Sequence, residues 1–335
     1  MTVPLSIPSP SAAWQYFDVI AWINSTFGAS LGGSLRIHAY ALCILAGIVV
    51  AGVITHHRLT ARGAERGIVV DVMLPTVILG IVGGRLFHVV THPGDYFAGQ
   101  SPLEIVAVWN GGLAIFGALL GGALGVLLGC RWTGLRFSVF ADSLAPGLLV
   151  AQAFGRLGNW FNHELFGWPT DLPWGLEIES SNAAYPTGLP AGTLFHPTFL
   201  YEIVWLVAGA LLLVAVERRV RLQWGKAIGF YFIWYGAGRA VFETIRVDPS
   251  LLFLGVRTNV WAALAAVVLG VVLVLVATRR HTGVVPSAYV PGRGPRDADS
   301  EVHSEDTYAE SDESDLVAAA PGDGQVHDRT ATTRD

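Results

Sequence analysis

Long apolar stretches alternate with short polar segments along most of the chain, and this pattern sets the expected architecture. A helix that crosses a bilayer needs about 20 predominantly apolar residues in succession. We expect such helices over residues 37–57, 69–90, 112–130, 138–157, 197–216, 227–246 and 258–278. The sequence therefore predicts an all-α polytopic membrane protein with seven transmembrane helices.

The composition supports a membrane protein and argues against several other classes. The 335 residues are 52% hydrophobic and only 14% charged, with a mean hydropathy of +0.50. No P-loop, dinucleotide-binding fingerprint, HExxH motif or paired CxxC motif is present, so nucleotide and zinc chemistry have no motif behind them. Cys43 and Cys130 are expected to be small packing residues. We expect no nucleic-acid partner.

The distribution of basic residues predicts the orientation of the helices. Loops 91–110 and 159–196 contain neither lysine nor arginine. Because cytoplasmic loops carry the excess of positive charge, we expect the N-terminus outside and the C-terminus in the cytoplasm. The basic residues that follow the first, third, fifth and seventh stretches are Arg58, Arg62, Arg66, Arg131, Arg136, Arg218, Arg219, Arg221, Lys226, Arg279 and Arg280.

Three segments are expected along the chain. Residues 1–36 lack the basic region and apolar stretch of a cleavable signal peptide, and their aromatic residues predict an outer-face segment along the membrane interface. Residues 37–280 form the membrane domain. Residues 281–335 are rich in Asp, Glu, Ser, Thr, Gly and Pro, which predicts a disordered acidic cytoplasmic tail. This tail accounts for much of the formal net charge of -5.

Glycine recurs every four residues in the third stretch, at Gly117, Gly121 and Gly125. Small residues at this spacing form a helix face that a neighbouring backbone can approach closely. We therefore expect tight helix packing here, and the Gly83–Gly84 pair of the second stretch can serve the same purpose. Arg85 follows this pair near a helix end, where a long side chain can also reach the membrane surface.

A cluster of polar residues adjoins the fourth stretch, in the sequence GRLGNWFNHELFG at residues 155–167. A charged side chain at bilayer depth costs about 2.5 kcal/mol or more. A polar helix end that caps its own carbonyl groups is the alternative explanation. The concentration of polar groups favours a binding site at the outer face. The residues concerned are Arg156, Asn159, Asn162, His163 and Glu164.

Further polar residues lie inside the later stretches. Tyr235, Arg239 and Glu243 recur every four residues and therefore share one helix face. An Arg239–Glu243 ion pair that neutralises itself is the structural alternative. The fifth stretch begins near His196, which can also anchor the interface, and it contains Glu202. The predicted topology places these positions toward the outer half: Tyr40, Arg156, Asn159, Glu164, His196, Arg239 and Glu243.

Two arginines with neighbouring amide groups are suited to binding a phosphate. The guanidinium group makes bidentate, charge-assisted hydrogen bonds to phosphate oxygens and stays protonated at physiological pH. In a membrane, the expected ligand is a phospholipid headgroup.

Several motifs together resemble the prolipoprotein diacylglyceryl transferases of bacteria. Residues 155–167 are similar to the family signature GRxGNFxNxExxG, with Trp160 at the position usually held by Phe. The resemblance covers about residues 35–280. It continues in IHAYAL at 37–42, GGR at 83–85, WNGG at 109–112, HPTFLYE at 196–202 and YGAGRAVFE at 235–243.

The resemblance implies an enzyme of the bacterial plasma membrane with its active site toward the outer face. It would transfer an sn-1,2-diacylglyceryl group from phosphatidylglycerol to the lipobox cysteine of exported prolipoproteins, releasing glycerol phosphate and forming a thioether. No metal or organic cofactor is implied. The implied catalytic residues are Arg239, Arg156, Tyr40 and Glu243. The implied substrate-binding residues are Arg156, Asn159, Asn162, Glu164, Tyr235, His196, Glu202, Arg85 and Arg246.

One position departs from the family pattern. Many members have a histidine after the Gly-Gly pair, in WDGGxxxHGG, whereas this chain has Phe116 there. Phenylalanine cannot accept a proton. Either His38, His196 or Glu243 is the base, or the positive field of Arg239 lowers the pKa of the substrate thiol without a dedicated base. We favour the second explanation.

Two other classes of function remain open on the residues alone. A lipid or anion transporter would use the same arginines for binding only, and a scaffold would use them only to hold helices together. Transporters often have two similar halves with interrupted helices, and no convincing repeat is present here. A scaffold would not need polar residues biased to one membrane face.

Overall fold

The computed structural model describes residues 6–97, 102–108 and 111–294, and it is helical with three short strand pairs. The helices are α1 (Val19–Phe27), α2 (Ala39–Thr60), α3 (Ile68–Thr91), α4 (Gly94–Phe97), α5 (Ile115–Thr133), α6 (Phe137–Phe161), α7 (Thr198–Glu217), α8 (Lys226–Ile245) and α9 (Thr258–Arg280). The strands are β1 (Tyr16–Asp18), β2 (Arg36–His38), β3 (Leu176–Glu177), β4 (Leu194–Phe195), β5 (Leu252–Phe253) and β6 (Val256–Arg257).

Each of the seven predicted stretches corresponds to one long helix. Among the described residues, six helices are long and apolar enough to cross a membrane: α2, α3, α5, α6, α7 and α9. The structure therefore shows a polytopic helical membrane protein. The remaining long helix, α8, has 20 residues but carries Lys226, Arg239 and Glu243.

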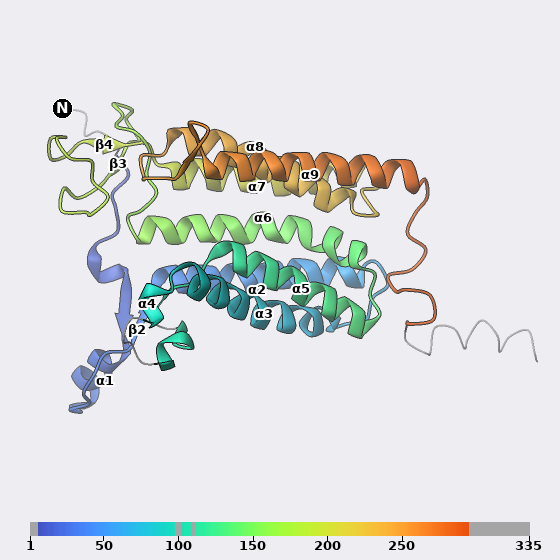
Figure 1. The fold of residues 1–335 in the computed structure, drawn as a ribbon, viewed down its shortest axis with the longest axis horizontal. Coiled ribbons are helices and arrows are strands. Elements are labelled where there is room, and N and C mark those ends of the chain that lie inside the picture. Colours follow the sequence, from blue (N-terminus) through green and yellow to red (C-terminus); the bar gives the residue numbers. More distant parts are fainter. Residues whose placement is uncertain (1–5, 98–101, 109–110, 295–335) are drawn as a thin grey trace, which may run out of the picture. The chain divides into compact units, whose positions relative to one another are not determined.

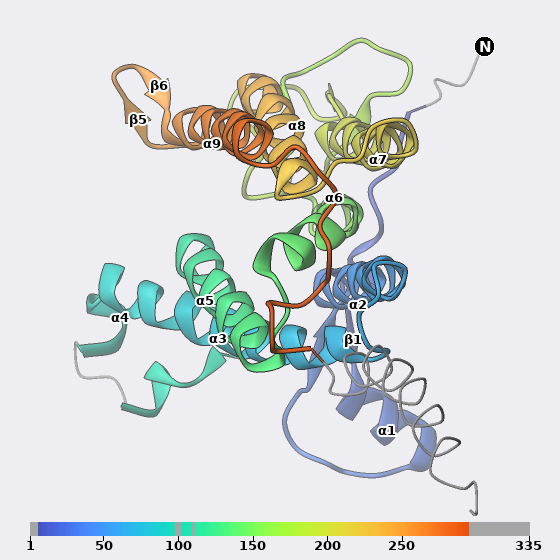
Figure 2. The same cartoon turned by 90° about the vertical axis from the view of Figure 1, so that its right-hand side faces the viewer.

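Helix α6 occupies the centre of the helical assembly (Figures 1 and 2). It packs against α2 on one side and against α7 and α8 on the other. Helix α3 pairs with α5, and α8 pairs with α9. Because consecutive long helices run in opposite directions, the C-terminal ends of α6 and α8 lie beside the N-terminal ends of α7 and α9 (Figure 1).

The α3–α5 pair packs through the glycine face that the sequence predicts. A Cβ atom added at Gly125 would lie 2.5 Å from Thr76 Cα, and one added at Gly121 would collide with the Leu79 carbonyl oxygen. Gly117 and Gly83 likewise face each other's backbone. The prediction of close helix packing is confirmed, because no larger residue fits at these positions without moving a backbone.

A pair of short strands, with α1 between them in the sequence, leads into α2 and so places its first residues. β1 and β2 pair antiparallel, with Tyr16 opposite His38. Asp18 caps α1 by accepting from the Ile20 and Ala21 amides, and its carboxylate also accepts from the Ser34 hydroxyl at 2.7 Å. The Ser34 bond, then the bond from the Ala21 amide, lower the pKa of Asp18. The Asp18 carboxylate therefore stays ionised, and continues to cap α1, in mildly acidic solution.

A second set of polar contacts fixes the opposite ends of the central helices. The Asp142 carboxylate on α6 accepts from the backbone amides of Gly225 at 2.8 Å and Ile228 at 3.1 Å, which caps the N-terminus of α8. Arg58 at the end of α2 pairs with Glu217 at the end of α7 at 2.7 Å. The contacts of Asp142 hold the N-terminus of α8 at this end, so Arg239 and Glu243 lie toward the opposite end of the helix.

The packed unit extends further than the sequence indicated. Residues 281–290, expected to begin the tail, return to the helix ends and belong to the compact unit that reaches Val290. The Arg136 amide donates to the Ala288 carbonyl, and the Val290 amide donates to the Gly134 carbonyl. Ala288 and Tyr289 are buried in an apolar cluster. The tail prediction for residues 295–335 lies outside the described residues.

We expect two C-terminal truncations to differ in stability. Removing residues after Gly294 should leave the thermal unfolding temperature unchanged. Removing residues after Arg280 should destabilise the protein by about 2–4 kcal/mol, because the buried Ala288 and Tyr289 are lost. Thermal unfolding of both proteins in the same detergent measures the difference, and equal stability would show that residues 281–290 contribute little to the fold.

Candidate functional site

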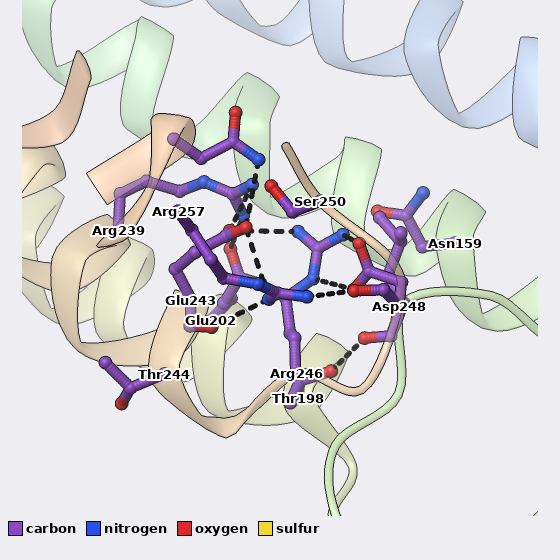
Figure 3. Close-up of polar contacts among 12 residues, drawn as sticks. Asn159, Thr198, Glu202, Arg239, Glu243, Thr244, Arg246, Asp248, Ser250 and Arg257 are labelled. Carbon is purple, nitrogen blue, oxygen red and sulfur yellow. Dashed lines mark hydrogen bonds and ion pairs between the residues drawn. The ribbon is translucent and has the colours of Figure 1, made fainter. Parts of the chain in front are cut away.

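Four long helices bring polar side chains together at one end of the assembly. The residues come from the end of α6, the start of α7, the end of α8 and the start of α9, and Figure 3 shows many of their contacts. The region thus combines segments that lie about 100 residues apart in the sequence. Most of the predicted site residues belong to it.

Glu243 is the centre of one half of this network. Its carboxylate is fully buried and has four side-chain nitrogens close to it. Oε1 accepts hydrogen bonds, whereas Oε2 has ion-pair contacts but no hydrogen bond in the described residues. Arg239 Nη2 lies 2.6 Å and Arg246 Nη1 3.5 Å from Oε2. Arg257 Nη1 lies 3.3 Å and Asn259 Nδ2 2.9 Å from Oε1 (Figure 3). The predicted Arg239–Glu243 pair therefore forms, but it is not a self-contained pair, because three further donors share the carboxylate.

Arg156 and Glu202 form the other half. Arg156 Nε lies 2.7 Å from Glu202 Oε2, and Arg239 Nη1 lies 4.0 Å from the same oxygen. Arg156 Nη1 also donates to the Asn159 side chain at 3.2 Å, which in turn donates to Glu164 at 2.8 Å. Glu202 thus connects the α6 residues with those of α8.

The loop after α6 is held in an unusual backbone conformation. His163 and Leu165 have positive φ angles of 53° and 60°, a region that costs roughly 1 kcal/mol or more per non-glycine residue. His163 is buried and its Nε2 lies 2.6 Å from the Pro10 carbonyl oxygen. Asn162 donates to Glu164 at 3.1 Å. The N-terminal segment therefore helps to hold the polar loop in place.

Two predicted tyrosines lie at the edge of the network. The Tyr40 ring packs on Gly158, where an added Cβ would lie 2.7 Å from the ring, and Tyr40 is close enough to Arg156 and Glu164 to interact electrostatically. Tyr235 lines a small cavity together with Glu202 and Arg239. It also stacks on Tyr231.

The network is electrically balanced yet leaves one donor open. Its four arginines and four carboxylates cancel in formal charge, which reduces the cost of burying them. Arg239 Nη1 is buried and has no hydrogen-bond partner in the described part of the chain. The charged members are Arg156, Arg239, Arg246, Arg257, Glu164, Glu202, Glu243 and Asp248.

An apolar groove adjoins the polar cavity between α7 and α8. The groove has a volume of about 540 Å³, and two of its lining residues, Trp205 and Phe242, also line the cavity that contains Glu202 and Arg239. The Trp205 and Trp234 indoles stack at 4.3 Å, and each donates to the other residue's carbonyl. A polar site therefore lies directly behind an apolar surface.

Two predicted site residues have other surroundings. Arg85 donates to the carbonyl oxygens of Ile105 at 2.9 Å and Gly111 at 2.6 Å, and also to those of Glu104, Gly112 and Ala107. Its guanidinium stacks on Tyr96. His196 Nδ1 lies 3.2 Å from the Tyr201 hydroxyl, which also accepts from Trp174. Neither residue is among the contacts that form the network.

Three members of the network were missed by the sequence analysis: Asp248, Arg257 and Asn259. Arg246 is held by Asp248, whose Oδ1 lies 2.6 Å from its Nε. The position of Arg257 in the sequence could have indicated that it belongs to the site. An arginine at the outer end of the seventh stretch contradicts the positive-inside pattern, and such a residue needs a partner or a ligand.

The fold and the site define the protein as a polytopic helical membrane protein with a buried arginine–carboxylate site beside an apolar groove. The chain belongs to the prolipoprotein diacylglyceryl transferase family, whose sequence model matches residues 28–276.

Named relatives cover most of the chain. It is 56% identical over 313 residues to the phosphatidylglycerol–prolipoprotein diacylglyceryl transferase of Leifsonia xyli subsp. xyli, covering 91% of this chain and 90% of that protein. It is 44% identical over 270 residues to the protein of the same name from Bifidobacterium longum, covering 77% and 86%. It is 41% identical over 282 residues to phosphatidylglycerol–prolipoprotein diacylglyceryl transferase 2 of Streptomyces coelicolor, covering 81% and 87%.

The surroundings of Arg85 predict a structural effect of its removal. Arg85→Gln leaves the carbonyl groups of Ile105, Ala107 and Gly111 without this donor, so the protein should lose about 1–3 kcal/mol of stability. Thermal unfolding measures this loss, with the exposed Arg66→Gln as a matched control. Unchanged stability with weaker lipid binding would instead make Arg85 a substrate-binding residue.

Proposed function

We propose that this protein transfers an sn-1,2-diacylglyceryl group from phosphatidylglycerol to the lipobox cysteine of exported prolipoproteins. The cysteine thiolate attacks the glyceryl carbon that bears the phosphate ester, and a carbon–sulfur bond forms. The carbon–oxygen bond breaks, and its electron pair goes to the phosphate oxygen. The products are a thioether-linked lipoprotein precursor and glycerol phosphate.

The main support for this proposal is that Arg239 Nη1 is buried and donates no hydrogen bond in the described residues. A phosphate oxygen can accept a hydrogen bond from Arg239 Nη1 without breaking an existing one, because that atom has none in the described structure. Arg156, which shares Glu202 with it, brings a second guanidinium to the same place. Negative charge grows on the leaving phosphate during the reaction, so both arginines stabilise the transition state more than the bound lipid.

The groove between α7 and α8 fits the rest of such a lipid. A phospholipid has a charged headgroup joined to apolar chains, and here an arginine cavity meets an apolar groove at Trp205 and Phe242. An acyl chain in the groove would place its headgroup at the mouth of this cavity. The cavity has a volume of about 10 Å³, so a phosphate reaches Arg239 only when Trp205 or Phe242 moves aside. Substrates that stay in the bilayer then reach the site sideways between helices.

In this proposal, α8 is a seventh membrane span and the network faces outward. Glu243, Arg239 and Arg246 neutralise one another, which lowers the cost of burying this helix. The basic residues at the opposite ends of the helices support an N-terminus outside and a C-terminus in the cytoplasm. The protein would then act in the bacterial plasma membrane, on lipids and precursors at its outer face.

The contacts also bear on how the thiol is activated. Glu243 is fully buried among three arginines, so its carboxylate is not accessible to a substrate thiol in this structure. His196 contacts Tyr201, outside the network. Phe116 packs with Phe87, with ring centroids 6.4 Å apart. These surroundings support activation of the thiol by the arginine field rather than by a dedicated base.

One experiment separates the transferase from the alternatives. Purified protein is incubated with a lipobox peptide and liposomes that contain phosphatidylglycerol, and the peptide is examined by mass spectrometry. A mass increase equal to one diacylglyceryl group supports the proposal. Lipid or anion movement across the liposome membrane with no peptide modification would instead support a transporter.

Arg239→Ala should lower kcat/KM at least about a hundredfold, because one preorganised donor to developing charge is worth about 3 kcal/mol. Arg239→Lys should recover little, since an ammonium group cannot reproduce the planar fork. The peptide assay measures both variants, and membrane insertion and thermal unfolding serve as controls. Near-normal turnover of the alanine variant would remove Arg239 from the mechanism.

The reaction rate should rise with pH as the substrate thiol ionises, because the thiolate is the nucleophile. His38→Gln and His196→Gln should each keep measurable activity, since neither is needed as a base in this mechanism. The measurement is the pH dependence of the initial rate for wild type and both variants. If one histidine variant is inactive but folded, and high pH restores part of its rate, that histidine is the general base.

A further inference from the structure

Two residues at the start of α9 contact the carboxylate that holds Arg239. Arg257 Nη1 donates to the Glu243 backbone carbonyl at 2.9 Å and lies 3.3 Å from Oε1 of its side chain. Asn259 Nδ2 donates to the same Oε1 at 2.9 Å. Arg257 Nη2 also donates to the Asp248 carbonyl, so Arg257 ties together the two ends of residues 248–257, which include β5 and β6 (Figure 3).

These contacts divide the two oxygens of Glu243 between different partners. Oε1 is taken by Arg257 and Asn259, and Oε2 is left to Arg239 Nη2 at 2.6 Å and Arg246. Arginine and a carboxylate ordinarily form a bidentate pair, in which both oxygens bind two nitrogens of the same guanidinium. Here Arg239 approaches the carboxylate through Nη2 only, as an ion pair with Oε2. Its Nη1, 4.0 Å from Glu202 Oε2, has no hydrogen-bond partner in the described residues, and neither has Glu243 Oε2.

We infer that Arg257 and Asn259 are positioning residues that keep Arg239 singly bound to Glu243, so that its second nitrogen stays available for the substrate phosphate. This inference rests on the proposed function, because it needs Arg239 to bind that phosphate. Without the two donors, Oε1 is released and Arg239 can close a bidentate pair with Glu243. The arginine would then be neutralised and turned away from the phosphate.

The geometry also predicts how the two residues differ. Arg257 has a structural contact to Asp248 in addition to its contact with the carboxylate, whereas the described contact of the Asn259 side chain is to Glu243. Asn259→Ala therefore tests the positioning role with little disturbance of the β5–β6 segment. Arg257→Lys keeps a positive charge near Oε1 but cannot bridge the carboxylate and two carbonyls.

The experiment measures kcat and KM separately for phosphatidylglycerol and for a lipobox peptide. Arg257→Gln should lower kcat by about tenfold to a hundredfold, since misplacing a reacting group by about 1 Å costs up to that much. Asn259→Ala should lower kcat by about fivefold, as expected for one hydrogen bond. KM for the peptide should not change, and Arg257→Lys should recover part of kcat. Arg279→Gln, at the other end of α9, is the matched control.

Thermal unfolding distinguishes positioning from a purely structural role. Asn259→Ala should unfold within a few degrees of wild type while its kcat is reduced. Wild-type kcat in both Asn259→Ala and Arg257→Lys would overturn the inference, as would losses that follow the unfolding temperature and affect both KM values equally. If wild-type protein itself forms no thioether, the proposed function fails; if it does and these variants match it, only the positioning role fails.

Discussion

The buried carboxylate of Glu243 is the interaction on which the site depends. An ionised carboxylate in an apolar interior is stable only when donors surround it, and here they come from α8, from the segment that follows it and from α9. The same contacts join these segments to one another. Removing one of the arginine partners would leave a buried charge uncompensated, which typically costs about 3–5 kcal/mol. The site and the packing of α8 with α9 therefore depend on the same contacts.

Electrical balance explains how four arginines can be held at the ends of membrane helices. Their charges are cancelled by four carboxylates, so the resting network resembles a set of buried ion pairs. Such a network is poorly suited to bind an anion unless one donor is kept out of it. Arg239 Nη1 is that donor. A preorganised, partly unsatisfied cation is the arrangement that stabilises charge as it develops, because no reorganisation is needed during the reaction.

The sequence predicted the helices well because their signal is continuous over about 20 residues, and the glycine face of α5 because its period matches the helix. Contacts between segments far apart in the sequence were harder to predict. Arg85 lies in a site motif, yet its partners are backbone carbonyls that no side-chain pattern encodes. The partnership of Arg257 with Glu243 depends on how α8 and α9 pair. Residues 281–290 have a tail-like composition, yet the burial of Ala288 and Tyr289 and hydrogen bonds of Val285 and Val290 hold them to the rest of the fold.

Glycine and tryptophan explain how the polar cavity can lie so close to lipid. Trp205 and Trp234 stack across α7 and α8 and satisfy their indole N–H groups on each other's carbonyls, so the groove wall is almost entirely apolar. Gly238 lies against the Trp205 indole, which allows the two helices this close approach. Arg239 is the next residue on α8. The Gly238–Trp205 packing therefore brings the Arg239 backbone to the boundary between groove and cavity, and the ion pairs with Glu243 and Glu202 place its guanidinium there.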